Sequence, residues 1–125
     1  MRLKNPLTKF QADHNYLAKG FTRRDINDNS VEDIIIGESS NIFSLQLQYA
    51  IIKPIANHAQ QGMLYFTLND PAYELDHEYV YAPPEIVTID FNPSVVGSNL
   101  VLNITTSGIG ENPIFYYKIL NIEEV

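Results

Sequence analysis

The residues of this 125-residue chain that could do chemistry begin with its three histidines, His14, His58 and His77. No two of them have the spacing of a metal-binding motif, and the chain has no cysteine. The best local cluster is Asp76-His77-Glu78. Successive side chains of a strand point to opposite faces, so the two carboxylates would lie on one side and the imidazole on the other. This cluster therefore cannot offer all three groups to one metal ion.

Acidic residues occupy every second position from 74 to 78 and form a row on one face of the predicted strand: Glu74, Asp76 and Glu78. Such a row could bind calcium if a neighbouring loop added oxygen ligands. The simpler interpretation is a solvated strand face whose like charges discourage edge-to-edge aggregation. We favour the solvated face and expect no metal site.

The chain carries no catalytic signature. A hydrolase needs a nucleophile beside a base, or two carboxylates across a cleft, and no GxSxG motif occurs. Gly108 and Gly110 lie between two apolar runs, where a hairpin turn explains them better than a phosphate loop does. We therefore expect no enzyme, no catalytic residues and no cofactor.

A row of tyrosines is the candidate surface for a ligand. Tyr73, Tyr79 and Tyr81 would share one face of one strand. Aromatic rows can stack on sugar rings, and tyrosine also suits protein interfaces because it supplies contact area at low entropic cost. The third interpretation is a half-buried core or rim position in a protein without tryptophan. All three remain open.

The basic residues are concentrated at the start of the chain. Six of the eight lysines and arginines lie in the first 24 positions, which carry about +5, whereas residues 25–125 carry about −12. Opposite charges favour docking of a basic segment of one copy on the acidic body of another. Folding back on its own body is the alternative. We predict exchange between subunits or onto a partner, through Arg2, Lys4, Lys9, Phe10, Tyr16, Leu17, Lys19, Phe21, Arg23 and Arg24.

The elements that must position these residues have a period of two from Val31 onward. The clearest run is NIFSLQLQYAII, where Phe43, Leu45, Leu47, Tyr49 and Ile51 alternate with more polar residues. A polar connection is expected over 53–62, and turns at Asn69-Asp70-Pro71 and Asn92-Pro93-Ser94. The predicted strands are 31–36, 41–52, 63–69, 72–82, 85–91, 99–106 and 113–120.

About seven strands separated by turns, with no convincing interior helix, predict an all-β fold, an antiparallel β-sandwich. Residues 1–30 form a basic N-terminal arm in this prediction, and residues 31–125 form the sandwich domain. The arm is expected to be extended or partly helical, with Thr8 as a helix cap and Gly20 just past the end.

Charge and hydropathy exclude several classes of partner. The acidic body would be repelled by nucleic acid and by an anionic membrane surface. No stretch approaches the roughly 20 apolar residues of a membrane span. The first residues carry Arg2, Lys4 and Lys9 without an apolar run behind them, which is not the pattern of a signal peptide.

The segments NIFSLQLQYAII, GMLYFTLND, EYVYAPPEIVTIDFNPSVVGSNLVLNITTSG and ENPIFYYKI, in this order, resemble β-sandwich modules of tailed-phage virion proteins. The resemblance lies in strand order and covers about 80 residues, from Asn41 to Leu120. It implies a structural subunit of a tail, neck, baseplate, fibre or capsid surface, which forms homo-oligomers, contacts other virion proteins and carries no cofactor.

A virion role implies synthesis in the host cytoplasm and residence in the particle. The length of a single module favours a small connecting or decorating subunit over a long fibre. The alternative function is a carbohydrate- or surface-binding module that uses Tyr73, Tyr79 and Tyr81.

Overall fold

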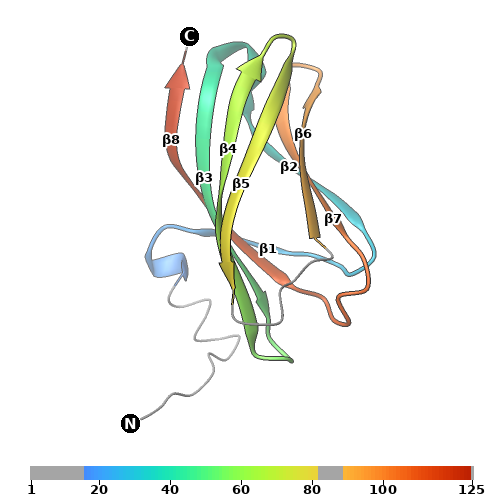
Figure 1. The fold of residues 1–125 in the computed structure, drawn as a ribbon. Helices are drawn as coiled ribbons and strands as arrows, with labels where there is room; N and C mark the ends of the chain where they lie inside the picture. The colour runs from blue at the N-terminus through green and yellow to red at the C-terminus, as the bar shows by residue number, and fades with distance from the viewer. Residues whose placement is uncertain (1–15, 82–88, 125) are drawn as a thin grey trace.

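The structure is a computed structural model that describes residues 16–81 and 89–124. Two antiparallel sheets lie face to face (Figure 1), which confirms the predicted β-sandwich. The larger sheet has the strand order β1-β8-β3-β4-β5 and the smaller has the order β2-β7-β6. The strands are β1 (Thr22–Asp25), β2 (Val31–Glu38), β3 (Ile42–Lys53), β4 (His58–Asn69), β5 (Ala72–Tyr81), β6 (Ile89–Val96), β7 (Asn99–Thr106) and β8 (Ile114–Glu124), with a 3-10 turn, η1 (Ser39–Asn41).

The alternating run in β3 builds the main core between the sheets. Leu45, Leu47, Tyr49 and Ile51 are buried there, as the period of two predicts. Phe43 departs from the prediction and is 51% exposed. The pairing of β3 with β8 shifts register between Ile42 and Ser44, so Ile42 takes the buried place instead.

Strand β4 is longer than predicted. The expected polar connection over 53–62 shrinks to a turn, because β4 begins at His58. Its first residues pair with β3 from Lys53↔His58 onward. Gln60 occupies an inward position and is buried, so a polar residue stands where the alternation calls for an apolar one. Because Gln60 interrupts the alternation of apolar residues, the sequence pattern does not predict the first part of β4.

Strand β6 also departs from the prediction. Its described part runs through Asn92-Pro93-Ser94, where a turn was expected, and Pro93 pairs with Leu102. Proline has no N–H to donate, and β6 lies at the edge of its sheet, where the outward side needs no donor. Residues 85–88 of the predicted strand lie outside the described residues.

The described part of the predicted arm joins the sandwich. Residues 16–18 are helical, and Gly20, whose φ of 87° is left-handed, lies just past the end of the helix. Thr22–Asp25 then pairs with β8 as an edge strand of the larger sheet. Its sequence, TRRD, gives no apolar signal, so the pattern did not reveal it as a strand.

Two carboxylates fasten the loops at one end of the sandwich. Asp28 accepts hydrogen bonds from the backbone N–H groups of Ile109, at 3.0 Å, and Gly110, at 2.9 Å. These bonds hold the pKa of the Asp28 carboxyl below its usual range. Glu111 accepts from the N–H groups of Ile55 and Ala56, at 2.8 and 2.9 Å. The β3–β4 turn and the segments before β2 and β8 are thereby linked.

Candidate functional site

The candidate site is the outer face of the larger sheet, meaning the side that points away from the smaller sheet. Alternation along each strand selects its residues, because their neighbours in sequence point into the main core. The outer face includes Ser44, Gln46, Gln48, Ala50, Gln61, Met63, Tyr65, Thr67, Glu74, Asp76, Glu78, Val80, Tyr116, Lys118 and Glu123.

Cross-strand pairing arranges the outer face in rows that run from β8 to β5. One row reads Lys118, Gln48, Met63, Glu78, and the next reads Tyr116, Ala50, Gln61, Val80. Successive residues of a row lie on neighbouring strands, which are about 4.8 Å apart. A lysine therefore stands at one end of the first row and a glutamate at the other.

The helical turn before β1 covers the β8 side of this face. Tyr16 stacks on Tyr116 with ring centroids 4.7 Å apart, and Phe21 meets Tyr16 edge-on at 5.3 Å. Phe21 and Tyr116 belong to a second buried cluster, which also contains Ala50 and Ile52. Burial raises the pKa of the Tyr16 hydroxyl. The segment is therefore a raised element packed on its own sheet.

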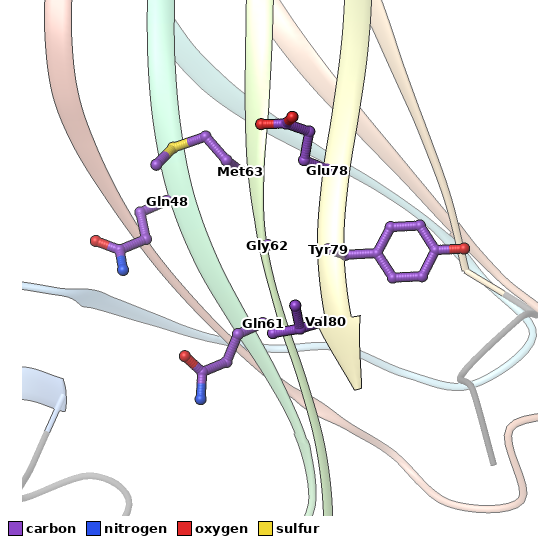
Figure 2. A pocket seen from close by; sticks show the side chains of 7 residues that line it. All are labelled: Gln48, Gln61, Gly62, Met63, Glu78, Tyr79 and Val80. Carbon is purple, nitrogen blue, oxygen red and sulfur yellow. The ribbon is translucent and has the colours of Figure 1, made fainter. Parts of the chain in front are cut away.

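A shallow depression of about 290 Å³ lies on the β5 side of the face, away from the helical turn. Figure 2 shows its side chains, and the ring of Tyr79 points away from the others, toward the opposite side of the sheet. Val80 is 70% exposed. The depression is lined by Gln48, Gln61, Gly62, Met63, Glu78, Tyr79 and Val80.

Gly62 explains how the sheet is packed beneath this depression. It pairs with Tyr49 on one side and Tyr79 on the other. A Cβ at position 62 would lie 2.5 Å from Tyr49 Cε2 and 2.6 Å from the carbonyl oxygen of Glu78. The ring of Tyr49 thus occupies the space that any other residue would fill.

Charge is distributed unevenly over the outer face. Glu74, Asp76 and Glu78 are exposed along β5, as the solvated-face interpretation expects. Tyr65 donates a 2.7 Å hydrogen bond to Glu78 Oε1, and this bond raises the pKa of the Tyr65 hydroxyl. On the opposite side, Lys118 Nζ donates to the Lys19 carbonyl at 2.8 Å. The β5 side of the face is therefore acidic, whereas β8 contributes Lys118 in one row and Glu123 in another.

The arm residues that were predicted to form an interface differ in their environments in the structure. Arg2, Lys4, Lys9 and Phe10 lie outside the described residues. Tyr16 and Phe21 pack on the same chain, whereas Leu17 remains 49% exposed and Lys19 is exposed.

The two arginines of β1 make intramolecular ion pairs. Arg23 contacts Asp25 at 2.8 Å, within β1. Arg24 reaches Glu32 of β2 at 3.4 Å and the carbonyl of Asp33 at 3.3 Å, which joins an edge of the larger sheet to an edge of the smaller one. In the described structure both therefore contact their own chain.

The predicted tyrosine row does not lie on the outer face. Tyr73 is 7% exposed and donates hydrogen bonds to the carbonyl groups of Ser39, at 2.8 Å, and Ile42, at 2.6 Å. Tyr73 is therefore a core residue, which corrects its place in an exposed row. Tyr79 is 40% exposed and stacks on His77 at 4.6 Å. The side chain of Tyr81 lies outside the described residues.

A polar cluster inside the sandwich was missed by sequence reasoning. Gln60 Nε2 donates a 3.0 Å hydrogen bond to the Tyr49 hydroxyl, which lies 2.5 Å from His77 Nε2. The edge of the His77 ring also meets Phe91 of the smaller sheet at 5.2 Å. His77 thus points inward while Asp76 and Glu78 point outward, as expected. Only the strand order, which the sequence does not state, brings the three polar groups together.

Within the described ranges, 16–81 and 89–124, no group of three or more histidine or acidic side chains could hold a metal ion. No helix in that part of the chain is long and apolar enough to cross a membrane.

Comparison with known proteins gives a match of fold. No family model and no curated protein sequence matches the chain. Among solved structures, the chain is similar to the tailspike protein of Acinetobacter phage vB_ApiP_P1, with a TM-score of 0.51 and 12% sequence identity. The match covers 100% of this chain and 24% of the tailspike, so the chain spans about a quarter of that protein's length. At the level of fold, this likeness agrees with the resemblance to phage modules.

Proposed function

We propose that this chain is a structural subunit of a tailed-phage virion, in a tail, neck, baseplate, fibre or capsid-decoration position. The observation that carries the proposal is the similarity of the whole chain, from end to end, to one part of a phage tailspike. A module that is embedded in a larger virion protein can serve as a small separate subunit if its surfaces join it to neighbours.

The composition of the outer face supports a role in assembly. Its centre holds glutamine, methionine and tyrosine side chains from β3 and β4, whereas its charges lie at the two sides. Interfaces between proteins are enriched in tyrosine and methionine and have few charges at their core. We propose that this face contacts other subunits, together with the N-terminal residues, and that the protein acts without a cofactor or a catalytic step.

The test is whether the chain is present in particles. We expect quantitative mass spectrometry of purified phage particles to find the chain at a fixed copy number per particle. The particles should come from a host culture that produces this chain, and an abundant protein of the same lysate serves as the control for contamination. A chain that is abundant in the lysate but no more enriched in particles than this control would contradict the proposal.

Carbohydrate or surface binding is the second candidate, and the depression on the outer face favours it. Gln48, Gln61 and Glu78 offer hydrogen-bonding groups beside the apolar surface of Val80 and Met63. Sites for small ligands combine an apolar wall with a few polar groups in this way.

The second candidate is tested with two variants. On a glycan array, Gln61→Ala is expected to lose retention. Gln46→Ala, the same change on the same face, is expected to keep it, because Gln46 is not among the residues that line the depression. Failure of the parent chain to bind any glycan would remove this candidate.

A further inference from the structure

We propose that the outer face binds the same face of a second copy of this chain, in a two-fold dimer. The two-fold axis would lie above the outer face, over the line midway between β3 and β4, and would run parallel to these two strands. This inference rests on the proposed role as an assembling subunit and names the partner and the surface. It is carried by the pattern of charge and shape across the face.

The strand order determines which elements meet. Rotation about an axis between β3 and β4 places β3 of one copy over β4 of the other, and β8 over β5. Because the axis is parallel to the strands, residues in the same cross-strand row remain at the same height. An interface of this kind is self-complementary, so every contact occurs twice.

The charges match under this rotation. Lys118 and Glu78 stand at opposite ends of one row, Lys118 on β8 and Glu78 on β5. Each lies about 7 Å from the axis, one and a half strand spacings away. The rotation therefore places Lys118 of each copy opposite Glu78 of the other, while Gln48 and Met63 meet near the axis.

The relief of the face matches as well. The helical turn over residues 16–18 rises above Tyr116, on which Tyr16 stacks. Val80, at the far end of the Tyr116 row, lies in the depression. The rotation sets the raised turn of one copy over the depression of the other. Leu17 of one copy, which is half exposed on that turn, then contacts the exposed side chain of Val80 of the other copy.

One row of the face is unfavourable in this dimer because it pairs two glutamates, and this row provides a control for the test. Glu74 on β5 shares a row with Glu123 on β8, through Thr67 and Ser44. The rotation brings these two carboxylates toward each other, so the contact in this row is repulsive. Glu78 and Glu74 therefore have opposite expected effects on the dimer.

The experiment measures the dissociation constant of the full-length chain by sedimentation equilibrium at one fixed ionic strength. Glu78→Lys is expected to raise the dissociation constant about tenfold or more, because two attractive contacts become repulsive. Lys118→Glu is expected to do the same. The double variant Glu78→Lys/Lys118→Glu is expected to recover most of the loss, since the pair is restored with its signs exchanged.

The matched control is Glu74→Lys, the same change of residue and charge on the same strand. It is expected to lower the dissociation constant by a few-fold, because it replaces repulsion with attraction toward Glu123. If only net charge mattered, both glutamate variants would strengthen association equally, since each reduces the net charge of −7. Equal effects, a double variant as weak as its parents, or a full-length chain that is monomeric throughout would overturn the dimer.

These outcomes are distinct from those of the virion test. A monomeric chain that is present at a fixed copy number in particles would overturn the dimer and leave the proposed function in place. A dimer with the expected charge dependence that is absent from particles would do the reverse.

Discussion

An alanine at position 62 would test how tightly the sheet is packed beneath the depression. Its Cβ would contact Tyr49 and the backbone of Glu78 at 2.5–2.6 Å, and a backbone atom cannot move aside as a flexible side chain can. We expect Gly62→Ala to lower the free energy of unfolding by about 1–3 kcal/mol, the usual cost of overpacking. Urea denaturation of the dilute protein measures it.

Gly37→Ala is the matched control for this substitution. Its Cβ would meet only the terminal Cδ1 atom of Ile42, at 3.0 Å, which can rotate away. We expect a change within about 1 kcal/mol, because alanine also restricts the unfolded chain. Equal losses for the two variants would show that Tyr49 does not need the space at Gly62.

Acid stability should depend on Asp28. Hydrogen bonds from the N–H groups of Ile109 and Gly110 lower the pKa of its carboxyl in the folded state, so the unfolded chain binds a proton more readily. The stabilisation is therefore complete above the usual aspartate pKa and is lost as the pH falls through the lowered value. We expect Asp28→Asn to destabilise the protein at neutral pH, and the difference from the parent to shrink on acidification.

Thermal unfolding of both proteins from neutral pH down to strongly acidic pH measures this difference. The asparagine keeps one oxygen as an acceptor but loses the charge and the second acceptor. Parallel loss of stability in the parent and the variant over the acid range would mean that another carboxylate is responsible.

The helical turn and β1 act as one element that seals the second buried cluster. Phe21 is buried there beside Tyr116, Ile52 and Ile114. Truncation of a buried phenylalanine removes its contacts and leaves a cavity. We expect Phe21→Ala to cost about 3 kcal/mol in a chemical denaturation experiment, although this residue lies in the segment whose sequence indicated an arm.

Leu17→Ala provides the comparison for Phe21, because it changes the exposed side of the same turn. We expect a loss of about 0.5 kcal/mol or less in the dilute monomer. If the two variants cost the same, or if Phe21→Ala costs nothing, the turn does not seal the cluster in solution.

Elements with a clean period were predictable, and those without one were not. The alternation of β3 announces both the strand and its buried side, from Leu45 to Ile51. The first residues of β4 were missed because Gln60 is a buried polar residue, satisfied by the hydrogen bond that it donates to Tyr49 of β3. Pro93 was read as a turn, since only a strand at a sheet edge tolerates it, and edges are a property of the topology.

The candidate site was less predictable than the fold for the same reason. The acidic row on β5 was visible as a row, but its relation to Lys118 depends on two intervening strands. Tyr73 and Tyr79 do follow the predicted alternation, yet the face they share points toward the smaller sheet. A period of two assigns residues to one face without saying which face is buried.

At the scale of the whole molecule, the sheets combine pairs of strands that are consecutive in the chain with pairs that are far apart in it. β3 with β4, β4 with β5, and β6 with β7 are hairpins between consecutive strands. β3 with β8, β2 with β7, and β1 with β8 join segments far apart in the chain. Distant pairings of this kind are slow to form, so folding is expected in the range of milliseconds to seconds.

The same topology predicts where the backbone opens least. β3 lies between β8 and β4, and β7 lies between β2 and β6, so their amides are protected from both sides. β5 and β1 are edge strands of the larger sheet and can fray without disturbing the core. We expect native-state hydrogen exchange to be slowest at amides such as those of Leu47, Tyr49 and Leu102. At these amides exchange should require global unfolding, so added denaturant should accelerate all three with one common slope.

Amides of β5 that are protected in the native state should exchange at least about tenfold faster than these, with little dependence on denaturant, since local opening exposes little surface. The measurement is made on the dilute monomer, so that contact between copies does not protect the edge. Protection of β5 equal to that of β3 under these conditions would mean that the larger sheet opens as one unit. The edge would then be as stable as the centre, contrary to the order of the strands.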